Sequence, residues 1–260
     1  MKNILKFIFF LTILTTTSFG SIASEQSQKL LNPGWSFKGF FGKFDRSSLQ
    51  RGYQVYTEVC AACHSIKYLS YRNLAQQGGP EFSKEQAKII ASQFEVIDGP
   101  NSEGDMFTRP ARLSDNFVGP YANEEAAKSA NGGAYPPDMS VLVKARKGGA
   151  SYIYSILLGY DDPPPDVSLE DGVYYNTYMS GNKIKMSKPL SENLVQYSDG
   201  TQASEEQMAK DVSTFLAWAA EPNLEQRHKM GFRAVLYLII ITILVYFSMK
   251  KIWSRIETDV

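Results

Sequence analysis

The sequence predicts a mainly α-helical chain with long loops and one C-terminal transmembrane helix. Three observations lead to this prediction: an apolar run near the N-terminus, helix-start signals between residues 47 and 219, and a longer apolar run over 231–249. The chain has 260 residues, of which 43% are hydrophobic and 21% charged. That composition excludes a disordered chain, a collagen-like chain and a protein with many membrane spans.

Residues 1–23 have the pattern of a secretory signal peptide. Lys2 and Lys6 form a basic start, an apolar run follows over 7–14, and small residues occupy the cleavage positions. An uncleaved membrane anchor is the alternative, but this apolar run is too short to cross a bilayer comfortably. We therefore expect residues 24–226 to form an exported domain.

The expected exported domain contains several sequence patterns that are typical of helices. We expect helices near 47–62, 84–97, 123–131, 138–158 and 204–219. The capping boxes Ser83-Lys-Glu-Gln86 and Ser204-Glu-Glu-Gln207 mark the clearest helix starts. Pro, Gly and Asp gather in 98–122 and 160–202, which predicts loops there. The chain has no nucleotide-binding or nucleic-acid-binding motif, so we expect no nucleic-acid partner.

The second apolar run, Gly231–Met249, contains one charged residue, Arg233. At about 1.5 Å of rise per residue it makes roughly 28 Å of helix, close to the thickness of a bilayer's hydrocarbon core. A buried core helix is the alternative, but this run has no polar face and basic residues flank it. We expect a lipid-embedded anchor helix over 227–252 and a cytoplasmic tail over 253–260.

The formal net charge of zero conceals an uneven distribution of charge. The segment 1–23 carries +2 and the segment 227–260 carries +4, so residues 24–226, with 19 basic and 25 acidic side chains, carry −6. One set of acids lies close together around three prolines: Asp161, Asp162, Asp166, Glu170 and Asp171. A solvated loop is the alternative, but as a set they are candidates for docking a basic partner by electrostatic steering.

Both cysteines of the chain lie in one motif, Cys60-Ala-Ala-Cys63-His64. This is the spacing of c-type haem attachment. Two thiols on one helical turn can each bond a vinyl group of the same porphyrin, and the adjacent imidazole is then carried to the iron. A redox-active disulfide does not need the histidine, and a zinc site needs about four ligands, whereas the only other histidine is His228. The motif predicts one covalently bound haem c.

An electron-transferring haem iron needs a sixth ligand. Methionine is the natural candidate, because His228 lies at the predicted membrane boundary. Met106 fits a separate loop, whereas Met139 and Met208 fit the buried faces of helices. Met179 and Met186 lie in a segment rich in Tyr, Gly and Asn after the central helices, and Pro189 would stiffen the loop beside Met186. The residues alone leave the choice of ligand open.

Longer stretches of the chain resemble the cytochrome c1 family, the haem subunits of the ubiquinol–cytochrome c reductase (bc1) complex. The matching stretches, in family order, are Trp35–Arg46, Gly52–His64, Ala130–Asp138, Leu157–Tyr160 and Ala219–Pro222. Together they cover nearly all of residues 35–250. The resemblance implies a cytochrome c-like haem domain with long loops on a bacterial-type membrane anchor.

The resemblance also assigns site residues. It implies Met186 as the axial methionine opposite His64. It implies that the following residues line the haem: Asn131, Ala134, Pro136, Pro137, Arg146, Tyr152 and Ile184, with Arg146 and Tyr152 near a propionate. Two features depart from the family pattern: the chain lacks the extra cysteine pair of some members, and Tyr135 replaces the usual leucine.

The function that the resemblance implies is one-electron transfer from a Rieske iron–sulfur protein to a cytochrome c. It further implies cytochrome b as a partner, a dimeric complex, and a place in the bacterial inner membrane with the haem domain in the periplasm. Catalysis of quinol oxidation would lie in the partner subunits, so no catalytic residue is expected on this chain. A haem subunit of a different complex, such as a terminal oxidase, and a peroxidase or sensor with an open haem position remain as alternatives.

Overall fold

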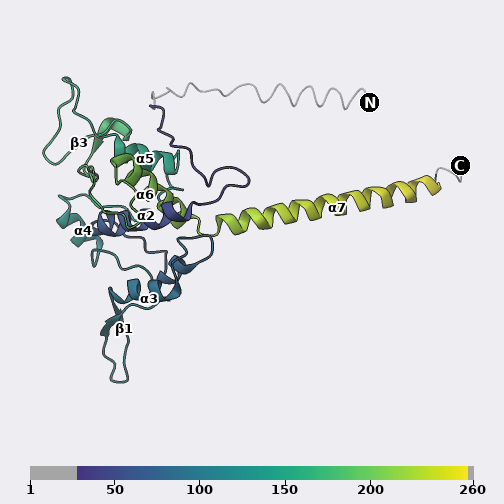
Figure 1. Ribbon diagram of the computed structural model, residues 1–260, viewed down its shortest axis with the longest axis horizontal. Coiled ribbons are helices and arrows are strands. Elements are labelled where there is room, and N and C mark those ends of the chain that lie inside the picture. Colours follow the sequence, from purple (N-terminus) through teal and green to yellow (C-terminus); the bar gives the residue numbers. More distant parts are fainter. Residues whose placement is uncertain (1–27, 257–260) are drawn as a thin grey trace, which may run out of the picture.

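The computed structural model describes residues 28–256 of the chain. The predicted signal peptide over 1–23 and the end of the predicted tail, 257–260, lie outside the described residues. Figure 1 shows a body of short helices and long connecting loops, from which one long helix, α7, projects alone.

Helices dominate the described part of the chain. The α-helices are α2 (Arg46–Glu58), α3 (Lys84–Ser92), α4 (Glu124–Ala130), α5 (Ala150–Leu158), α6 (Glu205–Ala220) and α7 (Leu224–Ile256). Short 3-10 helices are η1 (Cys60–Ala62), η2 (Tyr71–Ala75) and η3 (Ser180–Asn182). The strands β1 (Glu95–Asp98) and β2 (Phe107–Pro110) form one antiparallel pair, and β3 (Tyr174–Tyr175) and β4 (Lys183–Ile184) form another. The predicted mainly α class is confirmed.

Both predicted helix starts are confirmed, and the capping box is complete at Ser83. The Ser83 hydroxyl accepts a hydrogen bond from Gln86 N (3.1 Å), and the Gln86 side chain accepts one from Ser83 N (2.8 Å) at the start of α3. The Ser204 hydroxyl accepts from Gln207 N (3.2 Å) at the start of α6. These bonds satisfy backbone donors that the first helical turn leaves without a partner.

The predicted helix over 84–97 is too long. The observed helix α3 ends at Ser92, and the last three residues of the predicted helix, 95–97, belong to the strand β1 instead. Val96 pairs with Arg109 and Ile97 with Thr108 in the two-stranded ladder. β-Branched side chains favour this extended pairing, which the helical interpretation of the sequence did not include.

The predicted helix over 138–158 is also too long, because only Ala150–Leu158 is α-helical. Gly148 and Gly149 have φ values of +95° and +60°. These left-handed conformations are open to glycine and interrupt a right-handed helix, so the chain turns here and α5 begins afresh. The predicted loops over 98–122 and 160–202 are confirmed apart from the short pieces β2, β3, η3 and β4.

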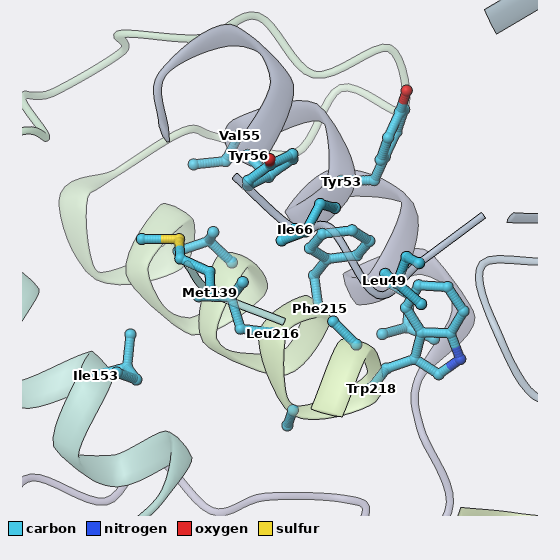
Figure 2. Packing of buried hydrophobic residues seen from close by; sticks show 14 of the residues in the cluster. Leu49, Tyr53, Val55, Tyr56, Ile66, Met139, Ile153, Phe215, Leu216 and Trp218 are labelled. Atoms are coloured by element: carbon cyan, nitrogen blue, oxygen red, sulfur yellow. The ribbon is translucent and has the colours of Figure 1, made fainter. Parts of the chain in front are cut away.

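The core lies between α2 and α6. Figure 2 shows Phe215 and Trp218 of α6 packed against side chains of α2. The Phe215 ring lies 5.8 Å from the Tyr53 ring and 5.7 Å from the Tyr56 ring, centroid to centroid. Phe215 and Trp218 are fully buried. Burying a side chain of this size stabilises the fold by roughly 1.5–3 kcal/mol, so this contact fixes the helix that leads into the haem motif.

Gly52 sets the distance between these helices. A Cβ at Gly52 would lie 2.1 Å from the backbone oxygen of Asp211 and 2.8 Å from Cβ of Phe215. Beside this contact, the fully buried Asp211 carboxylate accepts from Nε (2.7 Å) and Nη2 (3.2 Å) of Arg51. The hydrogen-bonded pairing compensates for burying the two charges.

Helix α7 begins at Leu224 and ends at Ile256, so it extends beyond the predicted anchor at both ends. Within Leu224–Ser254, an 18-residue stretch has a mean hydropathy of 2.2, and none of that stretch is buried in the body. A helix of 33 residues is about 50 Å long. By length and composition, α7 could cross a membrane.

We predict that Gly52→Ala destabilises the body of the protein. The added methyl meets backbone atoms of α6 that cannot rotate away, and overpacking of this kind costs about 1–3 kcal/mol. Thermal unfolding followed by circular dichroism should show a melting temperature several degrees lower. Ser47→Ala, at an exposed position of α2, is the control and should leave it unchanged. Equal melting temperatures for the two variants would contradict the close packing of α2 on α6.

Candidate haem site

The Cys60–His64 motif forms a single tight turn directly after α2. Val59 N still donates to Val55 O (3.0 Å), and the 3-10 helix η1 then begins at Cys60. Cys63 N and His64 N both donate to Cys60 O, at 3.1 and 2.9 Å. The turn therefore carries two thiols and an imidazole away from the core contact of α2 with α6.

The two cysteines are free thiols. Burial, with a smaller contribution from neighbouring Cys63, raises the pKa of Cys60 to about 12. A reactive cysteine of a redox disulfide has a lowered pKa, because the thiolate is its nucleophilic form. The surroundings of Cys60 therefore favour the protonated thiol and not the thiolate of a redox-active pair.

The ring of His64 is fixed by its backbone partner. Nδ1 lies 2.8 Å from Pro137 O, and because a carbonyl can only accept, Nδ1 carries the proton and donates. No residue within 28–256 makes a hydrogen bond to Nε2. Burial lowers the pKa of His64, although the bond to Pro137 and the charge of Asp138 oppose this effect. A neutral imidazole with a free Nε2 lone pair is the form that binds a metal.

Asp138 holds the segment that fixes His64. Its Oδ2 accepts from the Ser65 hydroxyl (2.7 Å) and from Lys67 N (3.0 Å), and its Oδ1 accepts from Ser140 N (2.9 Å). Burial raises the pKa of Asp138, but these hydrogen bonds outweigh burial and hold the pKa below its usual range. Asp138 is thus an ionised clamp between the residues after His64 and the residues after Pro137.

The segment 131–137, which holds four of the predicted pocket residues, lies beside the Cys60–His64 turn. Cys63, Tyr135 and Pro136 line one small hollow of about 30 Å³ together with Tyr121. Asn131 Nδ2 donates to the Tyr121 hydroxyl (3.0 Å) and to a backbone carbonyl in α4 (2.7 Å). Tyr135 is 43% exposed, so this larger residue lies at the rim of the hollow and not in the core.

The two candidate methionines differ in what holds them. The Sδ atom of Met179 accepts a hydrogen bond from the Tyr152 hydroxyl (3.5 Å). Met186 is held by its backbone, where its carbonyl accepts from the Tyr160 hydroxyl (3.0 Å), and no described side chain bonds to its sulfur. The sulfur of Met186 is therefore the one left open for a ligand.

The loop of Met186 also approaches the predicted pocket. Lys185 Nζ lies 3.5 Å from Gly132 O. The residue before Met186 therefore contacts the residue after Asn131. Ile184 lies in β4, paired with Tyr174. Arg146 is exposed, and its guanidinium donates only to the neighbouring Ala145 carbonyl (3.1 Å) within the described chain. Its charge is free to pair with an anionic group.

The acidic residues predicted for docking lie on the surface. Asp161, Asp162, Asp166, Glu170 and Asp171 are all exposed, and none forms an ion pair with another described residue. Asp161 and Asp162 line an open hollow of about 410 Å³ with Tyr174 and Lys188. Lys188 is itself neutralised by Glu205 at 2.7 Å. The negative potential of this surface is therefore not cancelled locally.

These groups fit a covalently held haem c. Two free thiols on one turn could bond its two vinyl groups, and an imidazole nitrogen and a thioether sulfur without partners among the described residues could hold its iron. Sequence reasoning found these residues but missed Asp138 as a clamp. An acid after two prolines reads as a helix start, and its partners lie about 70 residues earlier, at Ser65 and Lys67.

Known proteins resemble this chain over most of its length. The model of the cytochrome c1 family matches residues 35–256. The chain is 46% identical over 245 residues to cytochrome c1 1, a mitochondrial heme protein of Arabidopsis thaliana, covering 93% of this chain and 79% of that one. It is 41% identical over 251 residues to cytochrome c1 of Rhodospirillum rubrum, covering 90% and 91%.

A third relative has a different length. Cytochrome b/c1 of Bradyrhizobium diazoefficiens is 46% identical over 251 residues, which are 89% of this chain but 36% of that protein. The chain thus spans about a third of that relative and most of the other two. With the family model and these identities over most of its length, the chain belongs to the cytochrome c1 family, a family of haem proteins.

Proposed function

We propose that this chain is the electron-transfer subunit of a ubiquinol–cytochrome c reductase (bc1) complex, carrying one covalent haem c. The observation that carries the proposal is the neutral, oriented His64 directly after two free thiols. Family relatives support it, since one is named a cytochrome b/c1 and another, from Candida albicans, a cytochrome b-c1 complex catalytic subunit.

In this proposal Cys60 and Cys63 attach the haem, and His64 and Met186 are its axial ligands. The bound haem supplies reversible one-electron chemistry at iron. Pro137 keeps the His64 ring in one orientation and tautomer, and Tyr160 holds the backbone of Met186. An imidazole with a thioether favours a high reduction potential, which suits delivery of electrons to a cytochrome c.

The remaining pocket residues have supporting roles. We propose that Asn131, Ala134, Pro136, Pro137, Arg146, Tyr152 and Ile184 line the haem. Arg146, which has no carboxylate partner among the described residues, would pair with a propionate. The rigid setting lowers the reorganisation that accompanies a change of charge, because the polar groups are already oriented.

The partners follow from the same proposal. The donor would be a Rieske iron–sulfur protein, the acceptor a cytochrome c, and cytochrome b a neighbour in a dimeric complex. Residues 1–23 would be removed as a signal peptide, 24–226 would lie in the periplasm, and 227–252 would cross the lipid of the bacterial inner membrane. The tail, 253–260, would then be cytoplasmic. No group of this chain is required as a catalytic acid, base or nucleophile.

Replacing Met186 by leucine should lower the midpoint potential, because the thioether that favours the ferrous state is lost. We expect a fall on the order of 100 mV or more and binding of carbon monoxide by the reduced protein. Redox titration and the carbon monoxide difference spectrum measure both. Met179→Leu is the matched control and should preserve both properties. A normal potential in Met186→Leu with a shifted one in Met179→Leu would assign the ligand to Met179.

The exposed acids should steer a basic cytochrome c. Neutralising two of them in Asp161→Asn/Asp162→Asn should slow the bimolecular reaction at low ionic strength by roughly two- to fivefold. The difference should shrink as salt rises, because salt screens exposed charges. The control is Glu103→Gln/Asp105→Asn in the β1–β2 hairpin, which lies at the opposite end of the body from β3 (Figure 1). Equal rates for both pairs in stopped-flow measurements would refute docking at this loop.

Membership of the bc1 complex has a direct test. After gentle detergent extraction, a tagged chain should co-purify with a b-type cytochrome and an iron–sulfur protein, and the preparation should oxidise ubiquinol with cytochrome c as acceptor. Mass spectrometry and the b-haem absorbance identify these partners. Copper-containing oxidase subunits in their place would support the alternative of a terminal-oxidase haem subunit and reject the proposal.

A further inference from the structure

A short loop beside α7 exposes two aromatic rings. The Phe40–Phe41 loop, residues Lys38–Lys43 with the sequence Lys-Gly-Phe-Phe-Gly-Lys, leaves Phe40 60% and Phe41 77% exposed. The neighbouring aromatic residues Trp35, Phe37 and Phe44 are at most 8% exposed. Adjacent exposed phenylalanines are unfavourable in water and mark a contact with another apolar phase.

The loop is fixed in this exposed conformation. Lys43 N donates to Ser36 O (3.0 Å), and Gly42 N donates to Gly39 O (3.2 Å), which closes the two ends of the loop. A Cβ at Gly42 would lie 2.2 Å from Phe37 O, so only glycine permits this close approach. The buried rings of Phe37 and Phe44 pack against each other, with centroids 4.9 Å apart and the ring planes tilted by 31°. The tip is therefore presented by a rigid base.

The exposed rings meet α7 where its apolar run begins. Phe40 and Phe41 lie 6.4 and 6.2 Å from the ring of Phe232, and 4.9 Å from each other. Phe232 is the second residue of the apolar run Gly231–Met249. Trp253, an exposed ring near the far end, is about 32 Å away along the helix. That separation matches the hydrocarbon thickness, so Phe232 and Trp253 mark its two boundaries.

A buried carboxylate fastens the base of the loop to α7. Glu225, near the start of α7, accepts from Phe44 N (3.0 Å) and from both terminal nitrogens of Arg46 (2.9 Å each). Glu225 is only 8% exposed. This bidentate pairing is strong because both groups are charged and well aligned. The loop therefore keeps its position relative to the helix.

The charges around the tip complement a lipid surface. Lys38 and Lys43 flank the phenylalanines, are exposed, and form no ion pair with another described residue. Lys229 and Arg233 of α7 are exposed on either side of Phe232. An apolar tip between cationic side chains suits the bilayer interface, where rings enter the acyl boundary and amines reach the phosphates.

We propose that the Phe40–Phe41 loop is a second membrane contact, with both rings in the periplasmic interface of the bilayer and Lys38 and Lys43 at phospholipid phosphates. This inference rests on the proposed membrane span of α7. A single helix leaves the exported domain free to rotate about the helix axis, whereas a helix and an inserted loop define a plane. The loop thus sets the tilt of the haem domain over the membrane.

A spin label at the tip tests the inference in the assembled complex. Haem attachment would consume both native cysteines of this chain, so Phe41→Cys gives the chain one reactive thiol for a nitroxide, and the labelled complex without this substitution gives the background. The complex is placed in vesicles of phosphatidylcholine and phosphatidylglycerol, and power saturation compares collisions with lipid-soluble oxygen and with a water-soluble nickel chelate. Leu238→Cys in α7 and Tyr68→Cys, 76% exposed on the body, are the lipid and water references.

We expect the label at Phe41→Cys to resemble that at Leu238→Cys, with nickel collisions several-fold below those at Tyr68→Cys. Phe40→Cys should give the same result and serves if the first variant does not assemble. Nickel access equal to that of Tyr68→Cys would place the loop in water and overturn the inference. An immobilised label shielded from both reagents would indicate a protein partner and overturn it equally. Nickel access at Leu238→Cys would instead refute the membrane span of α7.

Discussion

The candidate site depends on one carboxylate, that of Asp138. It holds together two segments about 70 residues apart in the chain, because it accepts hydrogen bonds from Ser65, Lys67 and Ser140. The carbonyl that orients His64 belongs to Pro137, the adjacent residue. Without the clamp, the turn after α2 would still form, since its hydrogen bonds are local, but the imidazole would lose its fixed acceptor.

Rigidity at the site is built on the packing behind it. The attachment turn continues the backbone hydrogen bonds of α2, and α2 is positioned by the close contact of Gly52 with α6. The buried pair of Arg51 with Asp211 resists sliding of one helix along the other. A ligand held on such a base keeps its geometry when the charge at the metal changes, which is the requirement for fast electron transfer.

Local signals made much of the fold predictable. The capping boxes at Ser83 and Ser204 located α3 and α6, and the apolar run located α7. The cysteine motif identified one side of the site, because thiols and imidazole are contiguous. The predicted helix ends were wrong where a local pattern was ambiguous. Val96 and Ile97 also fit a helix face, but in the structure they pair with β2. Gly148 and Gly149 interrupt the predicted helix over 138–158 because both have positive φ.

Long-range contacts explain what the sequence could not provide. The choice between Met179 and Met186 depends on Tyr152 and Tyr160, whose hydroxyls reach residues 27 and 26 positions away, respectively. Residue types alone give no information on which hydroxyl meets a sulfur and which meets a carbonyl. The same limit applies to Phe40 and Phe41. In the sequence they are two phenylalanines of an aromatic stretch, which suggests a place in the core. In the structure Phe37 and Phe44 are buried, whereas Phe40 and Phe41 are exposed.

The distribution of charge has a geometric consequence for the proposed function. The unpaired acids of 161–171 lie in the body of the protein, whereas Lys38, Lys43, Lys229 and Arg233 gather where the body meets α7. If α7 spans an anionic membrane as proposed, the membrane attracts the second group and repels the first, so electrostatics would turn the acidic loop away from the lipid. Steering of a soluble basic carrier requires that orientation, because a negative patch facing the bilayer would be inaccessible. A fixed tilt of the domain and an accessible docking surface are therefore two results of the same separation of charge.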